Sequence, residues 1–255
     1  GETCAPATAP KSAKGVAQDL TPQWQGRCDK GAWLRKVATP ADLIGGAAAQ
    51  GRVGDWSIGN KQVRFIIQAD DRHSGPCPWG GNVIDADVIR AKGAAGHDNM
   101  GEYCLLLNLG RTFRGTEFEV LNSGASGGPA ILAVTGADTL LDFINLPSMV
   151  GQYLPVAIKL PFDAELDLPV QITRYYILPP SGAAMTVITA IRNDGDAELH
   201  LAVGEIIDSG GQIQFFNPAS SLGGFGYKGF GAEKLDFLAF RGAESSHAFA
   251  PAGAS

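Results

Sequence analysis

The sequence predicts an all-β protein made of two packed, mainly antiparallel sheets with an extended N-terminal arm. From Gly54 onwards, apolar residues alternate with polar ones or form short runs, which is the pattern of β-strands. These segments end at Gly, Asn, Asp and Pro, and the chain of 255 residues contains 34 Gly and 15 Pro. Many short strands with turn signals between them favour two sheets packed face to face.

Residues 1–53 are predicted to be the arm, with one short helix. The first thirty residues are rich in Ala, Pro, Lys and Gln and show no periodicity. The best helix candidate is Pro40–Ala49, with Thr39 as N-cap and Pro40 at the first helical position.

Residues 54–255 are predicted to form a single β-sandwich domain. Val63, Phe65 and Ile67 alternate with polar residues and indicate an early strand. Further strands are predicted at 82–90, 103–109, 113–122, 129–135, 170–178, 185–193, 199–208, 212–217 and 235–240. The long segment 137–169 contains four prolines and is predicted to be an irregular crossing between the two halves of the domain.

Two polar turns divide the later strands. Asn193–Asp196 and Asp208–Gly211 place Asn, Asp and Gly where a positive φ is needed. The segments from 185 to 217 are therefore predicted to form consecutive hairpins.

The four cysteines indicate two disulfides and an oxidising compartment. They contain no CxxC spacing, which argues against zinc-ribbon and thioredoxin-like sites. Three connectivities are possible, and we favour Cys4 with Cys28 and Cys77 with Cys104, because neighbours in sequence close the smaller loops. The chain is therefore predicted to be secreted, periplasmic or exposed at the cell surface.

The net charge and the hydropathy pattern argue against nucleic acid as a partner and against a membrane span. The net charge is −6 and basic residues do not form long clusters, which argues against nucleic acid. The longest apolar runs fall far short of the 18 or more residues of a membrane span, so none is predicted.

Two glycine-rich motifs match catalytic or nucleotide-binding signatures as strings, but their predicted surroundings do not fit those functions. Ser126 lies in Gly124–Pro129, which matches the nucleophile elbow G-x-S-x-G, but strands are predicted on both sides where an elbow needs a helix. The motif Gly224–Gly229 matches GxGxxG without the βαβ unit that dinucleotide binding requires. The aromatic rings of this second region are instead candidates for stacking on a sugar or, alternatively, for filling the core: Phe225, Tyr227 and Phe230.

An acidic cluster is the candidate cation or catalytic site. Its members are Asp85, Asp87, His97, Asp98 and Glu102. Asp85 and Asp87 project to the same face of a strand, where a carboxylate pair could bind Ca²⁺ or divide into acid and base. The structural alternative is that these carboxylates cap turns and pair with Arg72 and Arg90.

A second acidic pair is a weaker candidate. Glu205 and Asp208 are three residues apart in a predicted strand, which places them on opposite faces. We therefore do not expect them to act together in catalysis.

The order of motifs resembles a known type of module. The segments Gly80–Arg90, His97–Thr112 and Val120–Gly136 resemble the N-terminal β region of large secreted bacterial proteins, some of which continue into metallohydrolase domains of the polymerase-and-histidinol-phosphatase superfamily. The segments 174–179 and 189–196 are similar to galactose-mutarotase-like supersandwich modules. Because the metallohydrolase His motifs are missing, the resemblance implies an accessory domain, and the end at AFAPAGAS implies a domain truncated at its C-terminus.

Three functions follow from these observations. The leading expectation is an extracellular or periplasmic, non-catalytic β-sandwich module that binds a glycan or a partner protein. A second is a structural subunit of an extracellular assembly, such as a homo-oligomer, in which the arm or a free sheet edge pairs with a neighbour. A third is a carbohydrate-active or hydrolytic enzyme that uses Asp85, Asp87, His97 and Glu102.

Overall fold

The computed structural model describes residues 31–72, 75–108, 110–125, 127–141, 166–210, 214–218, 237–242 and 244–251. These residues form a ten-stranded antiparallel sheet and a separate sheet of three strands. The predicted all-β fold of two mainly antiparallel sheets is confirmed.

The large sheet has the strand order β1-β2-β3-β4-β5-β6-β7-β8-β9, with β10 paired to β5 beside this path. Its strands are β1 (Trp33–Lys36), β2 (Trp56–Gly59), β3 (Val63–Ile67), β4 (Val83–Val88), β5 (Tyr103–Leu107), β6 (Arg111–Asn122), β7 (Ala130–Leu140), β8 (Val170–Leu178), β9 (Thr186–Asn193) and β10 (Val203–Ile207). The small sheet contains β11 (Gln214–Phe216), β12 (Leu238–Arg241) and β13 (Ser246–Phe249).

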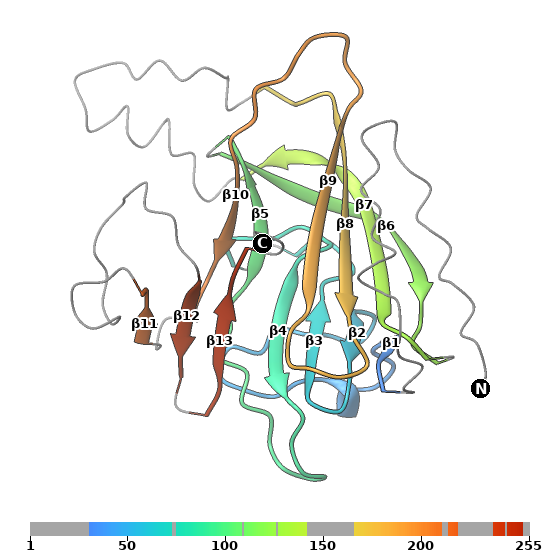
Figure 1. Ribbon diagram of the computed structural model, residues 1–255, viewed down its shortest axis with the longest axis vertical. Coiled ribbons are helices and arrows are strands. Elements are labelled where there is room, and N and C mark those ends of the chain that lie inside the picture. Colours follow the sequence, from blue (N-terminus) through green and yellow to red (C-terminus); the bar gives the residue numbers. More distant parts are fainter. Residues whose placement is uncertain are drawn as a thin grey trace.

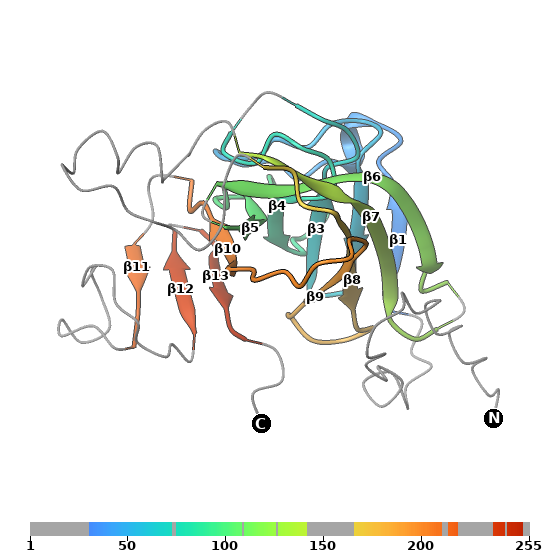
Figure 2. The same cartoon turned by 90° about the horizontal axis from the view of Figure 1, so that it is seen from above.

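The large sheet curls around the main core. Figures 1 and 2 show β8 and β9 lying across from β3 and β4, with β6 and β7 forming the bend between them. Different strands supply fully buried side chains to the cluster inside this curl, among them Ile58, Ile67, Leu105, Leu132 and Tyr176. Each such side chain contributes about 1.5–3 kcal/mol by leaving water, so the inside of the curl is the main source of stability.

The small sheet lies beside β5 and β10, on the side of the molecule away from β6 and β7 (Figure 2). The ring of Phe249 in β13 stacks on Tyr103 in β5, with 5.4 Å between ring centroids. This aromatic contact links the small sheet to the large one.

Strands β1, β2 and β13 were not predicted. Each has only four residues, too few to show a period of two. Strand β1 lies within 1–53 and pairs with β2, so the end of the predicted arm belongs to the large sheet. The predicted division between residues 53 and 54 is not otherwise tested.

The predicted helix Pro40–Ala49 is wrong beyond its first turn. Only a 3-10 turn forms, η1 (Pro40–Asp42), and Thr39 precedes it as expected, with its backbone N–H donating to Asp42 Oδ2 at 3.0 Å. Gly46 has φ +148° and forms a parallel bridge with Asp98. The backbone groups of this segment therefore bond to a distant part of the chain instead of to the next helical turn.

The predicted run of consecutive hairpins over 185–217 is also wrong. Strand β9 pairs with β8, while β10 pairs with β5 over its whole length. Asn108 and Ala202 exchange two hydrogen bonds of 2.9 and 3.0 Å, which fixes the chain beside β5 where β10 begins. The polar turn reverses the chain as predicted, but turn residues do not determine which strand the next segment meets.

Candidate functional site

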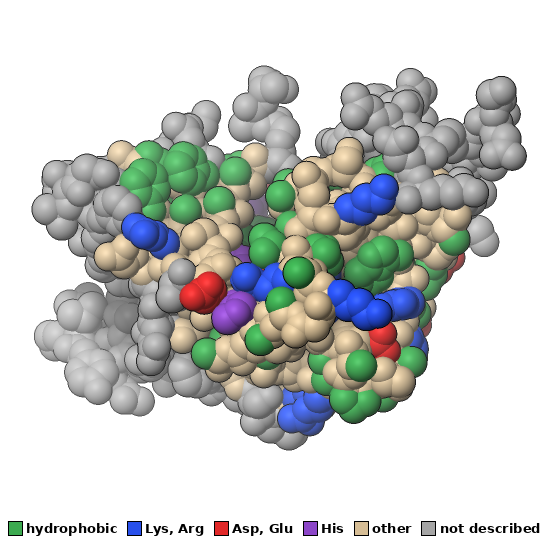
Figure 3. Space-filling model, turned by 90° about the horizontal axis from the view of Figure 1, so that it is seen from below, with side chains coloured by type: hydrophobic (Ala, Val, Ile, Leu, Met, Phe, Trp, Pro, Cys, Tyr) green, Lys and Arg blue, Asp and Glu red, His purple; other side chains and the backbone are tan. Residues whose placement is uncertain are grey.

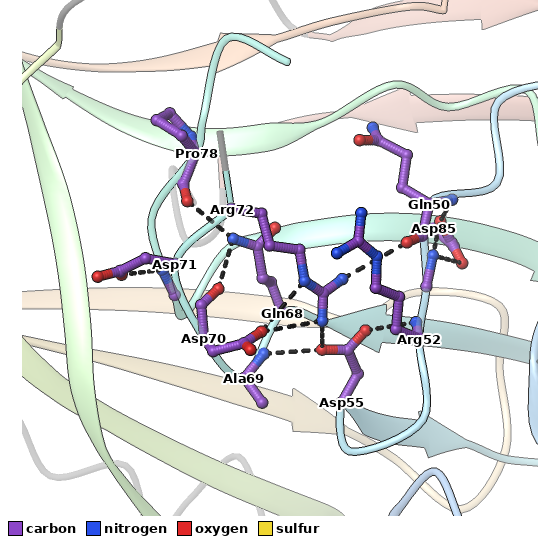
Figure 4. A network of polar contacts seen from close by, with 12 residues as sticks. Gln50, Arg52, Asp55, Gln68, Ala69, Asp70, Asp71, Arg72, Pro78 and Asp85 are labelled. Atoms are coloured by element: carbon purple, nitrogen blue, oxygen red, sulfur yellow. Dashed lines mark hydrogen bonds and ion pairs between the residues drawn. The ribbon is translucent and has the colours of Figure 1, made fainter. Parts of the chain in front are cut away.

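The predicted acidic cluster lies on the outer side of β4, beneath the segment 46–51. Asp85 is fully buried and accepts the backbone N–H groups of Gln50 at 2.6 Å and Gly51 at 3.0 Å (Figure 4). Asp85 therefore fixes a loop onto the sheet. Burial raises the pKa of Asp85 to about 6, against the opposing effect of these two hydrogen bonds.

Asp98 fixes a second loop to the same strand. Its Oδ1 accepts the backbone N–H groups of Ala86 at 2.9 Å and Met100 at 3.2 Å. Its Oδ2 is buried and accepts no hydrogen bond from a described residue. Burial raises the pKa of Asp98 to about 7, and the carboxylates of Asp85 and Asp87 act in the same direction.

Asp87 and Glu102 are also engaged with nearby groups. Asp87 pairs with Arg90 at 2.9 Å and accepts the backbone N–H of His97 at 2.9 Å. Glu102 accepts the backbone N–H of Cys77 at 2.6 Å. All four carboxylates of the cluster thus accept backbone hydrogen bonds, which is the arrangement of the structural alternative.

A buried ion pair extends this network toward β2. The guanidinium of Arg72 pairs with Asp55, which is fully buried, and with the exposed Asp70 at 3.1 Å (Figure 4). Asp55 also accepts the backbone N–H groups of Arg52 at 2.7 Å and Ala69 at 3.0 Å. The ion pair between Arg72 and Asp55 thus joins two chain segments, 52–55 and 69–72.

The geometry of this cluster gives no support to the Ca²⁺ site considered from the sequence, which stays a prediction. Within the described ranges, no three His, Cys, Asp or Glu side chains are placed to hold a metal ion. Both oxygens of Asp85 and Oδ1 of Asp98 already accept hydrogen bonds from backbone N–H groups, whereas Oδ2 of Asp98 accepts none from a described residue. No helix of the described chain is long and apolar enough to cross a membrane.

A different polar cluster lies inside the curl. Arg174 in β8 is fully buried, and its two terminal nitrogens contact the carboxylate of Glu205 in β10 at 3.2 Å. The guanidinium lies over the rings of Tyr103 and Tyr176, at 5.2 and 5.9 Å from their centroids. Arg174 is therefore held by one carboxylate and two aromatic rings.

Glu205 is the solvent-facing member of this cluster. Its side chain retains 29% of its exposure, whereas Arg174 has none. Burial raises the pKa of Glu205, while Arg174 and the Tyr103 hydroxyl act to lower it. Burial also raises the pKa of Tyr176 to about 12, so that phenol stays protonated and donates to the carbonyl of Gly81. The result is a fixed carboxylate with an accessible side.

Sequence reasoning missed this second cluster, although one signal was present. In β8, every second residue from Val170 to Leu178 is buried, and Arg174 stands in that series among apolar and aromatic residues. A charge on the buried face of a strand requires a partner, and that requirement could have identified Arg174. Glu205 was noted in the sequence beside Asp208, but it could not have been identified as the partner of Arg174, because β10 is not a neighbour of β8 in the sheet.

Several predicted residues lie outside the described part of the chain. These are Ser126, the aromatic residues Phe225, Tyr227 and Phe230, and Cys4 and Cys28. Strands do flank the motif that contains Ser126, because β6 and β7 form the hairpin around it. The predicted disulfide between Cys77 and Cys104 is confirmed, and both cysteines are fully buried.

The surface shown in Figure 3 is of mixed character. Lys and Arg side chains form a few separate patches, which apolar and polar groups divide. The described part of this face therefore presents no continuous basic track of the kind that follows a phosphate backbone. Scans against protein-family models, curated proteins and solved structures return no significant match.

Proposed function

We propose that this chain is a non-catalytic β-sandwich module of the periplasm or cell exterior, and that it binds a glycan. The observation that carries the proposal is the Glu205 carboxylate, held by Arg174 with one side open to solvent. Binding sites typically place a few fixed polar groups beside aromatic surface. A carboxylate accepts hydrogen bonds from sugar hydroxyls, and the Tyr103 ring, packed against Arg174 and Phe249, lies beside it.

The chemistry of the two clusters supports binding over catalysis. The carboxylates of Asp85, Asp87, Asp98 and Glu102 hold loops through backbone N–H groups. The guanidinium of Arg174 holds Glu205 in place, which suits a fixed hydrogen-bond acceptor for a ligand.

The disulfide supports the proposed compartment. Disulfides form and persist mainly in oxidising environments, and Cys77–Cys104 joins the segment before β4 to β5. The large secreted proteins that the sequence resembles belong to the same environment.

The test is a panel of immobilised glycans and cell-wall polysaccharides, with the affinity of any ligand then measured by calorimetry. We expect at least one member to bind, without release of new reducing ends. Glu205→Gln should weaken binding tenfold or more, because a hydrogen bond to a charged group contributes about 1.5–3 kcal/mol. Tyr103→Phe, which keeps the ring, should weaken it less.

Two results would overturn this proposal. One is no binding to any member of the panel by a protein with an intact thermal transition. The other is cleavage of a bound glycan that disappears in Asp85→Asn or Asp87→Asn.

A further inference from the structure

Strand β9 is the last strand of the large sheet within the described part of the chain. It pairs with β8 through eight residue pairs without a register shift, and no described strand pairs with its other side. The seven residues from Thr186 to Arg192 are all half-buried. The unpaired backbone N–H and C=O groups of such an edge are a template for another strand.

Strand β9 also lacks the features that prevent an exposed edge strand from pairing with another chain. Its sequence, TVITAIRN, contains no Pro or Lys and a single charged residue, Arg192. The β-branched residues Val187, Ile188 and Ile191 favour strand pairing. Natural proteins usually protect an edge of this length with charges, prolines or bulges. The composition of β9 is therefore typical of a strand that pairs with another strand on both of its sides.

We propose that β9 pairs antiparallel with β9 of a second copy of this chain. A two-fold axis at Thr189, perpendicular to the sheet, keeps each face of the sheet continuous across the interface. Val187 then lies opposite Ile191 of the second copy on the core-facing side, and Ile188 lies opposite Ala190 on the other side. Val187 and Ile191 already pack against the core and are half-buried, so this pairing covers their remaining apolar surface.

The charged residue of β9 is compatible with the register centred on Thr189. Arg192 lies opposite Thr186 of the second copy, so no like charges face each other. Moving the axis to Ala190 would instead place Ile188 opposite Arg192 and Val187 opposite Asn193. The register at Thr189 is preferred because it places apolar residues opposite apolar residues.

The experiment measures the mass of the full chain in solution by light scattering over a range of concentrations. We expect a dimer. The variant Ile188→Lys with Ala190→Lys places Lys opposite Lys twice and should weaken the dimer at least tenfold. The variant Ile188→Glu with Ala190→Glu should do the same, and an equal mixture of the two variants should recover the dimer.

A matched control carries two added lysines elsewhere. Val53→Lys with Val120→Lys changes residues that are 53% and 40% exposed, and it should leave the dimer intact. Thermal melting of each variant establishes that the monomer is folded.

Three results would overturn the proposal. The first is a wild-type chain that stays monomeric at every concentration. The second is a dimer that both β9 variants leave unchanged. The third is loss of the dimer in both variants without recovery in the mixture, which contradicts the register. Glycan binding by Glu205 is independent of all three.

Discussion

Arg174 in β8 and Glu205 in β10 form an ion pair across the inside of the curled sheet, although 31 residues separate them in sequence. Their strands are not neighbours in the sheet. The ion pair is therefore a side-chain link between two parts of the sheet that no backbone ladder joins. It also fixes the carboxylate that we propose as the ligand contact.

Removal of Glu205 should destabilise the protein strongly. Glu205→Ala leaves the fully buried Arg174 without its carboxylate, and an uncompensated buried charge costs about 3 kcal/mol. Urea unfolding followed by circular dichroism measures this loss. Asp194→Ala removes the acidic partner of a surface ion pair with Arg192 and should cause little change. Equal stability of the two variants would contradict the structural part of this account.

Asp85→Asn should destabilise the segment that Asp85 holds. The amide has only one acceptor oxygen for the N–H groups of Gln50 and Gly51, so we expect a loss of about 1–3 kcal/mol and faster hydrogen exchange at both amides. Asp70→Asn, at a side chain that is 75% exposed, is the control and should change neither quantity. An Asp85→Asn protein with unchanged stability and exchange would show that this carboxylate does not hold the loop.

Stability should fall as the pH rises from about 4 to 7. Burial raises the pKa of Asp85 to about 6 and of Asp98 to about 7, from 3.8 in the unfolded chain. The native state therefore binds more protons than the unfolded state in this range, and the free energy of unfolding decreases with pH. The lowered pKa of Asp87 acts in the opposite direction below about pH 4, and the lowered pKa of His247 does so up to about pH 6.5.

Urea unfolding at several pH values between 5 and 8 tests this expectation. Asp98→Asn should flatten the dependence, because the amide does not titrate. A free energy of unfolding that increases from pH 5 to pH 8 would exclude the predicted direction.

The disulfide between Cys77 and Cys104 should resist reduction in the native state, because both cysteines are fully buried. Replacing both with Ala should cost about 3.5 kcal/mol, the value for closing a loop with a sequence separation of 27. Peptide mapping without reduction should recover this pair, and it also tests the predicted pair Cys4 with Cys28. A different partner for Cys77 would contradict the fold around β5.

The strands were predictable where the sequence shows a local period. Strand β8 has the expected alternation over nine residues, and its bounds match the prediction. The turn at Asn193 also forms where expected, with its side chain accepting the N–H of Gly195 at 2.9 Å. Both features depend on residues close together in the chain, so a short window of sequence contains the necessary information.

The partners of the side chains were not predictable in the same way. The sequence suggested Asp85 and Asp87 as a pair, but Asp85 meets backbone groups 34 and 35 residues earlier in the chain. The contact between Arg174 and Glu205 depends on how the sheet curls and on the pairing of β10 with β5. Loop paths and strand pairings set these distances, and the local pattern does not determine them.

The most direct test measures glycan affinity and melting temperature together for Asp85→Asn and Glu205→Gln. We expect Asp85→Asn to lower the melting temperature and to leave the affinity of the folded protein unchanged. We expect Glu205→Gln to weaken binding at least tenfold when it is measured below the melting transition of that variant. The contradicting result is loss of binding in Asp85→Asn at an unchanged melting temperature, together with normal binding by Glu205→Gln. That result would place the ligand site at the acidic cluster and not at Glu205.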